Sequence, residues 1–125
     1  MDRDKYVYPA EILRVIDGDT VEARLDCGDL GFNLVLYTTQ ILRLHGINAP
    51  EVRGSQREQG LAATAHLKQL IDLYQPLVVE TIKDKQGKYG RYLAILRTAN
   101  PSNLKSPLSL NQQMVTDGHA LAKKY

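Results

Sequence analysis

Four short stretches of this 125-residue chain carry residue types that could bind or transform a charged ligand. Residues 17–20 (DGDT) hold a second carboxylate, Asp19, beyond the Asp-Gly pair that a hairpin turn needs. Residues 42–51 (LRLHGINAPE) place an arginine between two leucines, residues 88–91 (KYGR) form a basic, aromatic turn, and residues 123–125 (KKY) are basic and aromatic again. Each stretch alone has an ordinary explanation as solvated surface, so none identifies a reaction by itself.

Arg43 is the residue whose position most needs explaining. Alternate side chains of a strand point to opposite faces, so Arg43 and His45 share one face while Leu42 and Leu44 share the other. The alternation alone predicts only that Arg43 lies on the outward face. His45 could lie near the same site, although a single histidine is more often a packing residue.

The first half of the chain predicts strands. Residues 6–16 are rich in β-branched and aromatic side chains and lead into the Asp-Gly turn. Residues 21–26 alternate between apolar and polar, as in a half-buried strand. A break is predicted between residues 28 and 31, followed by a β-rich stretch at 32–47 that is long enough for more than one strand.

A long helix is predicted next. Ser55 and Glu58 have the spacing of a capping box at its start. Pro76 ends it, because the residue before a proline avoids helical geometry. Between these limits, four apolar residues repeat along one helical face: Leu67, Leu70, Ile71 and Tyr74.

The remaining chain predicts two strands, at residues 77–82 and 91–98, and a short helix. Ser109 and Gln112 form a second capping box, and Gly118 is placed to end the helix. This order of elements predicts an α+β fold. Because closure removes the edges of a small sheet, we expect a five-stranded β-barrel, with one long helix after the third strand and a short C-terminal helix.

Composition excludes several classes of protein. A chain with 43% hydrophobic and 24% charged residues is expected to fold, here as a single domain over residues 1–125. Cys27 is the only cysteine, so an internal disulfide is excluded. No signal-peptide pattern begins the sequence, and no stretch is long enough to span a membrane. We expect a monomer without membrane association, and the sequence leaves its compartment as cytoplasmic or unknown.

Taken together and in this order, the stretches at 17–20, 42–51 and 88–91 resemble the staphylococcal nuclease (thermonuclease) family. The resemblance extends from about Val15 to Ala120, and the predicted helices fall where the family has helices. It implies an oligonucleotide-binding (OB) barrel that hydrolyses DNA and RNA with little sequence specificity. The implied enzyme depends on Ca²⁺ and leaves 3′-phosphate products.

By this resemblance, Asp19, Asn48 and the backbone carbonyl of Ala49 are expected to hold Ca²⁺. Two of these positions depart from the family, which usually has aspartate at Asn48 and threonine at Ala49. An asparagine oxygen can still coordinate Ca²⁺ but brings no charge, so weaker cation binding is expected than at a site with two carboxylates.

The resemblance also assigns roles around the phosphate. Arg43 and Arg91 are expected to bind it through forked hydrogen bonds, which lysine cannot form. Glu51 is expected to orient or deprotonate the attacking water. Lys88 and Tyr89 match residues that contact a neighbouring phosphate of the substrate.

The segment between Asp19 and Arg43 is longer than in the family's type enzyme, which predicts an extended hairpin at residues 28–40. This hairpin could cover substrate, but a tolerated surface insertion is the favoured interpretation.

Two other functions stay open: a non-catalytic OB-fold module that binds nucleic acid or a protein, and an inactive protein that binds phosphorylated or methylated ligands. The second is supported only by the missing charge at Asn48. The chain has a full set of charged residues that a binding module would not need: Asp19, Arg43, Glu51 and Arg91. Their presence together favours the enzyme.

Overall fold

The computed structural model describes residues 5–32, 34–82, 92–99 and 109–123. Within these ranges the elements are β1 (Lys5–Asp17), β2 (Thr20–Gly31), β3 (Leu34–Leu44), β4 (Ile47–Asn48), a 3₁₀ turn (Gly54–Gln56), α1 (Arg57–Tyr74), β5 (Leu77–Ile82), β6 (Tyr92–Thr98), α2 (Leu110–Thr116) and β7 (Leu121–Ala122). None of the helices in the described ranges is both long and apolar enough to cross a membrane.

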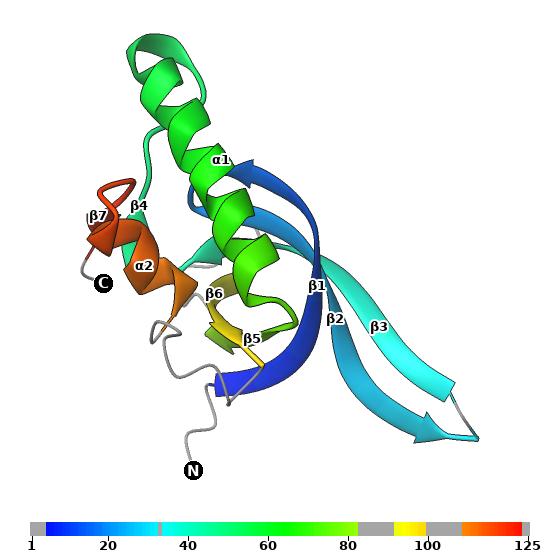
Figure 1. Cartoon of the computed structure of the whole chain (residues 1–125). Helices are drawn as coiled ribbons and strands as arrows, with labels where there is room; N and C mark the ends of the chain where they lie inside the picture. The colour runs from blue at the N-terminus through cyan, green and yellow to red at the C-terminus, as the bar shows by residue number, and fades with distance from the viewer. Residues whose placement is uncertain (1–4, 33, 83–91, 100–108, 124–125) are drawn as a thin grey trace.

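Five strands close into a barrel in the order β1-β2-β3-β6-β5 (Figure 1). The β3–β6 junction is parallel and the other four are antiparallel. This confirms the expected five-stranded barrel with a long helix after the third strand and a short helix near the C-terminus. The short strand β4 lies between β3 and α1 and pairs with β7 in a separate two-stranded sheet.

The core lies inside the barrel and against α1. Val21, Ala23 and Leu25 of β2 are buried, as their alternation with polar residues predicts. The predicted apolar stripe of α1 belongs to the same cluster or packs against it: Leu67, Leu70, Ile71 and Tyr74. Burial of this stripe fixes which face of α1 is turned to the barrel.

The predicted capping box at Ser55 and Glu58 is wrong. Ser55 lies inside the 3₁₀ turn, so its backbone does not have the extended conformation of a capping residue. The helix starts at Arg57, and the residue before it, Gln56, makes no side-chain cap. The end is as predicted, since α1 stops at Tyr74 before the Gln75-Pro76 pair.

The short helix α2 has the predicted caps at both ends. Ser109 is extended, and its hydroxyl accepts a hydrogen bond from the Gln112 N–H at 3.0 Å. At the other end Gly118 has a φ of +81°, which favours glycine. The N–H groups of Gly118 and His119 then donate to Val115 and Met114, so the chain leaves the helix in one defined direction.

Beyond the barrel, β2 and β3 continue as a two-stranded arm (Figure 1). This confirms the extended hairpin, but the predicted break between residues 28 and 31 is wrong. β2 continues to Gly31, and only its register with β3 shifts, on either side of Asp29. The arm exposes several large apolar side chains, with Phe32 at its end 98% exposed.

Candidate functional site

The turn between β1 and β2 provides the first group of the site. A Cβ on Gly18 would lie 2.8 Å from the Cβ atoms of both Ala49 and Ala63. Only glycine therefore lets the turn pack this closely against α1 and the segment after β4. As a result the next residue, Asp19, is a buried carboxylate with only 5% of its surface exposed.

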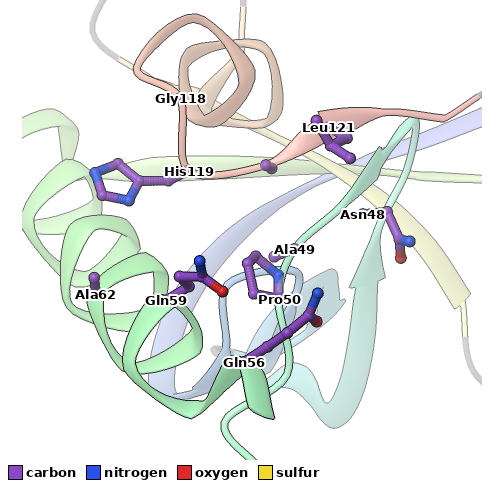
Figure 2. Close-up of a pocket in the computed structure, with 10 residues that line it drawn as sticks. Asn48, Ala49, Pro50, Gln56, Gln59, Ala62, Gly118, His119 and Leu121 are labelled. Carbon is purple, nitrogen blue, oxygen red and sulfur yellow. The ribbon is translucent and has the colours of Figure 1, made fainter.

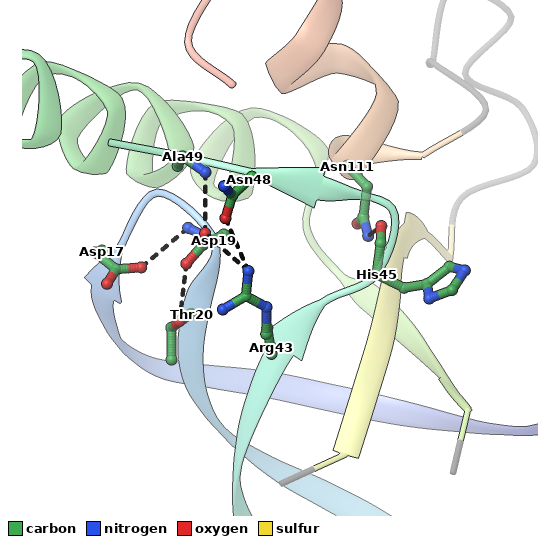
Figure 3. A network of polar contacts seen from close by, with 8 residues as sticks. All are labelled: Asp17, Asp19, Thr20, Arg43, His45, Asn48, Ala49 and Asn111. Atoms are coloured by element: carbon green, nitrogen blue, oxygen red, sulfur yellow. Dashed lines mark hydrogen bonds and ion pairs between the residues drawn. The ribbon is translucent and has the colours of Figure 1, made fainter. Parts of the chain in front are cut away.

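Two hydrogen bonds fix the orientation of the Asp19 carboxylate (Figure 3). Its Oδ2 accepts from the Ala49 N–H at 2.9 Å, and its Oδ1 accepts from the Thr20 hydroxyl at 3.0 Å. Its own N–H donates to Asp17 Oδ1 at 3.1 Å. The carboxylate therefore joins the hairpin turn to the segment that follows β4.

Arg43 reaches the same place from β3. Its neighbours Leu42 and Leu44 are fully buried, while Arg43 is half-buried on the other face, which confirms the predicted alternation. The Arg43 Nη2 donates to Asn48 Oδ1 at 2.9 Å and lies 3.8 Å from Asp19 Oδ2. An arginine, a carboxylate and an amide oxygen thus meet at one point (Figure 3).

His45 does not join this group. It follows the end of β3, and its side chain points away from Asp19 (Figure 3). It lines a separate cavity with Arg97 and Asn111. Its carbonyl accepts a hydrogen bond from Asn111 Nδ2 at 2.9 Å, a contact that joins α2 to the end of β3.

The two carboxyl groups of the turn are electrostatically unequal. Burial, together with the hydrogen bond and negative charge of Asp19, raises the pKa of Asp17 to about 6. Burial would also raise the pKa of Asp19, but hydrogen bonds from Asp17 and the Ala49 N–H, and the charge of Arg43, lower it below its ordinary value. Asp19 is therefore the group that stays anionic at neutral and mildly acidic pH.

These side chains surround a polar cavity of about 380 Å³. It is lined by Asp17, Asp19, Thr20, Arg43, Asn48, Ala49, Glu51 and Gln56. Five predicted site residues are therefore brought together: Asp19, Arg43, Asn48, Ala49 and Glu51. Arg91, Lys88 and Tyr89 lie outside the described residues.

Comparison with protein families identifies the group to which this barrel is related. The sequence model of the family described as staphylococcal nuclease homologues matches residues 41–125, which is well over half of the chain. The chain belongs to the staphylococcal nuclease family. No curated protein gives a significant match. Arg43, Asn48, Ala49 and Glu51 fall within the matched range. Asp19 precedes it, and a hydrogen bond from the Ala49 N–H and an ion pair with Arg43 join it to the matched part.

Three lining residues were not predicted: Asp17, Thr20 and Gln56. Asp17 and Thr20 flank the turn, and their direct cross-strand pairing brings both beside Asp19. A two-residue turn between them is a signal that could have placed both side chains at the site. Gln56 comes from the 3₁₀ turn before α1, and no local pattern indicates where that turn packs.

The ligand atoms in the lining can be compared with those that Ca²⁺, the cation implied by the resemblance, prefers. Among the described residues, no three His, Cys, Asp or Glu side chains form a group that could hold a metal ion. The donors near Asp19 are carboxylate and amide oxygens, which suit a hard divalent cation, and such cations also accept carbonyls and water. The residues therefore fit Ca²⁺, with fewer charged ligands than a tight site has.

Proposed function

We propose that this chain is a divalent-cation-dependent phosphodiesterase that cleaves DNA and RNA with little sequence specificity and leaves 3′-phosphates. The observation that carries the proposal is the polar cavity in which the Arg43 guanidinium lies beside the buried Asp19 carboxylate, with Glu51 in the same lining. A guanidinium and a cation-binding carboxylate at one point suit an anionic, oxygen-rich substrate better than a neutral one.

Arg43 is proposed to bind the phosphate. A phosphodiester is already anionic and gains charge at its oxygens as water attacks, so its hydrolysis needs positive charge that is held in place beforehand. β3 holds Arg43 by burying the leucines on either side of it, which keeps its guanidinium at the cavity. A planar guanidinium can donate two parallel hydrogen bonds to phosphate oxygens.

Asp19, Asn48 and the carbonyl of Ala49 are proposed to hold the cation, which when bound supplies positive charge beside the phosphate. The low pKa of Asp19 supports this role, because a cation ligand must be deprotonated. Asn48 Oδ1 now accepts from Arg43, so a cation and the guanidinium compete for this oxygen.

Glu51 is proposed to orient the attacking water and to accept its proton. The residue is exposed and lines the cavity, so its carboxylate can reach a water molecule there. The proton passes from the water oxygen to a Glu51 carboxylate oxygen as the new O–P bond forms. The bond from phosphorus to the 5′ oxygen of the next nucleotide breaks, and this oxygen takes a proton from solvent and leaves as a 5′-hydroxyl.

The resemblance to the family adds Arg91 as a second phosphate-binding guanidinium and Lys88 and Tyr89 as contacts to a neighbouring phosphate. The position of β6, the strand that follows Arg91 in the sequence, supports the assignment of Arg91. β6 starts at Tyr92 opposite Leu42, and Leu93 pairs with Arg43.

The direct test is to incubate single-stranded DNA and RNA with the protein in Ca²⁺ and in chelator. We expect fragments with 3′-phosphates in Ca²⁺ alone, and a loss of cleavage of about 100-fold or more in Glu51→Gln and in Arg91→Ala. No cleavage with any divalent cation would contradict the enzymatic proposal. If the strands are still bound, the result would favour a nucleic-acid-binding module.

A further inference from the structure

A second cavity, of about 480 Å³, adjoins the polar cavity, and most of its lining has no role in the reaction proposed above (Figure 2). It lies between the start of α1, the segment after β4 and the chain that links α2 to β7. Asn48, Ala49 and Gln56 line both cavities. A group bound in the second cavity would therefore be the immediate neighbour of a phosphate bound in the first.

The polar groups of this cavity are neutral carboxamides. Gln56 and Gln59 contribute one each (Figure 2), and the third belongs to Asn48, whose Oδ1 already accepts a hydrogen bond from Arg43. The described residues that line the cavity include no Asp, Glu, Lys or Arg. A phosphate would find no fixed cation here, whereas a neutral group with both donors and acceptors on its edge would find both partners.

An imidazole closes one side of the cavity in a fixed orientation. The ring of His119 stacks on that of His66, with the centroids 4.3 Å apart and 25° between the planes. His66 Nε2 is held by Asp117 Oδ2 at 2.6 Å, and Asp117 Oδ1 accepts from Gln113 at 2.7 Å. His119 lines the cavity, and the stacking on His66 restrains its ring.

The remaining surface is apolar. Pro50, Ala62 and Ala120 contribute to it, and so does Leu121, a large side chain that is 75% exposed. A ligand with flat apolar faces and a polar edge matches this combination of apolar surface, imidazole ring and carboxamides. Among the parts of a nucleotide, only the base has that form.

We propose that this cavity receives one unstacked nucleobase of the strand whose phosphate lies at Arg43. The inference rests on the proposed function, because the neighbouring phosphate places the strand. A base must leave its stack to enter, so single strands are preferred to duplexes. Carboxamides present a donor and an acceptor to any base edge, which makes the preference among bases small.

The test uses short single-stranded DNA in which one abasic site is moved position by position. Binding is measured by fluorescence anisotropy in chelator, and cleavage is measured in Ca²⁺. For the native chain we expect one position, next to the cleaved bond, at which loss of the base weakens binding and cleavage roughly tenfold. In Gln59→Ala and His119→Ala, the abasic site at this position should no longer weaken binding or cleavage. These variants are expected to bind the intact strand as weakly as the abasic one.

Gln69→Ala is the matched control, since Gln69 is exposed on the same helix and does not line the cavity. If Gln59→Ala and His119→Ala keep the same abasic dependence as Gln69→Ala, the base site is wrong, although the nuclease proposal stands. If the native chain cleaves nothing, the nuclease proposal is wrong. The binding measurement then still decides whether the cavity holds a base.

Discussion

The Arg43 guanidinium contacts Asn48 Oδ1 and lies near Asp19 Oδ2, the two side-chain oxygens proposed to hold the cation. Arg43→Ala should therefore change two properties in opposite directions. Cleavage should fall by about 100-fold or more, because a phosphate-binding guanidinium is lost. Ca²⁺ affinity should rise by roughly tenfold, because a competing positive charge has gone. Cleavage assays and calorimetric Ca²⁺ titration measure the two effects.

Arg43→Lys separates charge from shape in the same experiment. It keeps the positive charge but cannot form the forked contact, so cleavage should stay low while Ca²⁺ affinity stays close to the native value. A decrease in Ca²⁺ affinity in Arg43→Ala would show that the cation does not bind at these oxygens.

Asn48 determines how strongly a cation is expected to bind. Asn48→Asp adds a negative charge beside Asp19, so Ca²⁺ should bind roughly tenfold or more tightly, while Asn48→Ala should bind it more weakly. Titration of both variants provides the measurement. Equal affinities in the two variants and the native chain would mean that Asn48 is not a ligand.

Asp17 predicts a pH dependence of stability. Its pKa is raised from 3.8 to about 6 in the folded chain, so its contribution to stability is present below about pH 4 and is lost as pH rises through 6. Asp17→Asn keeps an oxygen that can accept from the Asp19 N–H and removes the buried charge. In chelator at pH 7.5 it should raise the free energy of unfolding by about 1 kcal/mol, a figure reduced for the partly exposed position.

At pH 4 the advantage of Asp17→Asn should disappear. Urea unfolding at both pH values checks this, with Asp72→Asn, an exposed carboxylate on α1, as the control. A variant less stable than the native chain at pH 7.5 would contradict the assigned burial and charge of Asp17.

Among single residues, five that line the polar cavity could be predicted from the sequence: Asp19, Arg43, Asn48, Ala49 and Glu51. They lie in two short segments whose residue types and order are distinctive. Gln56 could not be found in the same way, since only the packing of the 3₁₀ turn brings it to the cavity. Asn111 was also missed. Its side chain bonds His45, Ala94 and Leu96, and that role depends on where α2 packs rather than on any local pattern.

At the scale of elements, α1 and the segment that carries Glu51 meet at Gly60. A Cβ on Gly60 would overlap the carbonyl oxygen of Glu51 and lie 2.8 Å from the Val52 nitrogen. Gly→Ala inside a helix normally stabilises by up to about 1 kcal/mol. Here Gly60→Ala should instead destabilise by about 1–3 kcal/mol and lower cleavage, because the Glu51 segment must move.

Thermal unfolding and cleavage rates of Gly60→Ala test this contact. Ala65→Gly, at an exposed position of the same helix, reports the helix propensity alone and should destabilise the chain with no effect on cleavage. A stabilised Gly60→Ala variant would show that the close approach does not exist.

The strands and the stripe of α1 could be predicted because their periods follow directly from alternate or helical burial. The start of α1 could not, because the Gly60 contact and the 3₁₀ turn before it are tertiary features. The Ser55–Glu58 spacing matched a capping box, but Ser55 lies within the 3₁₀ turn that precedes the helix.

At the scale of the molecule, the β2–β3 arm is separable from the barrel. Of the described residues between 27 and 36, none belongs to the core. Asp26 and Tyr37 are cross-strand partners, so an Asn-Gly turn can replace residues 27–36 between them. This variant should keep its fold and cleavage, with a change in unfolding free energy below about 1 kcal/mol. Light scattering should show less self-association, because exposed apolar residues are removed.

Loss of cleavage in a folded arm-deleted variant would instead mean that the arm contacts substrate. Loss of folding would mean that it supports the barrel. Either result would contradict the interpretation of the arm as a tolerated insertion.

The pairing of β4 with β7 has a consequence for synthesis. Asn48 is joined to Leu121, so one wall of the polar cavity gains its strand partner only after residue 121 has been made. A chain emerging from the ribosome with its N-terminal strands first therefore carries Asp19 and Arg43 without a finished site. On the proposed function, this order keeps the site incomplete while the growing chain is still beside messenger and ribosomal RNA.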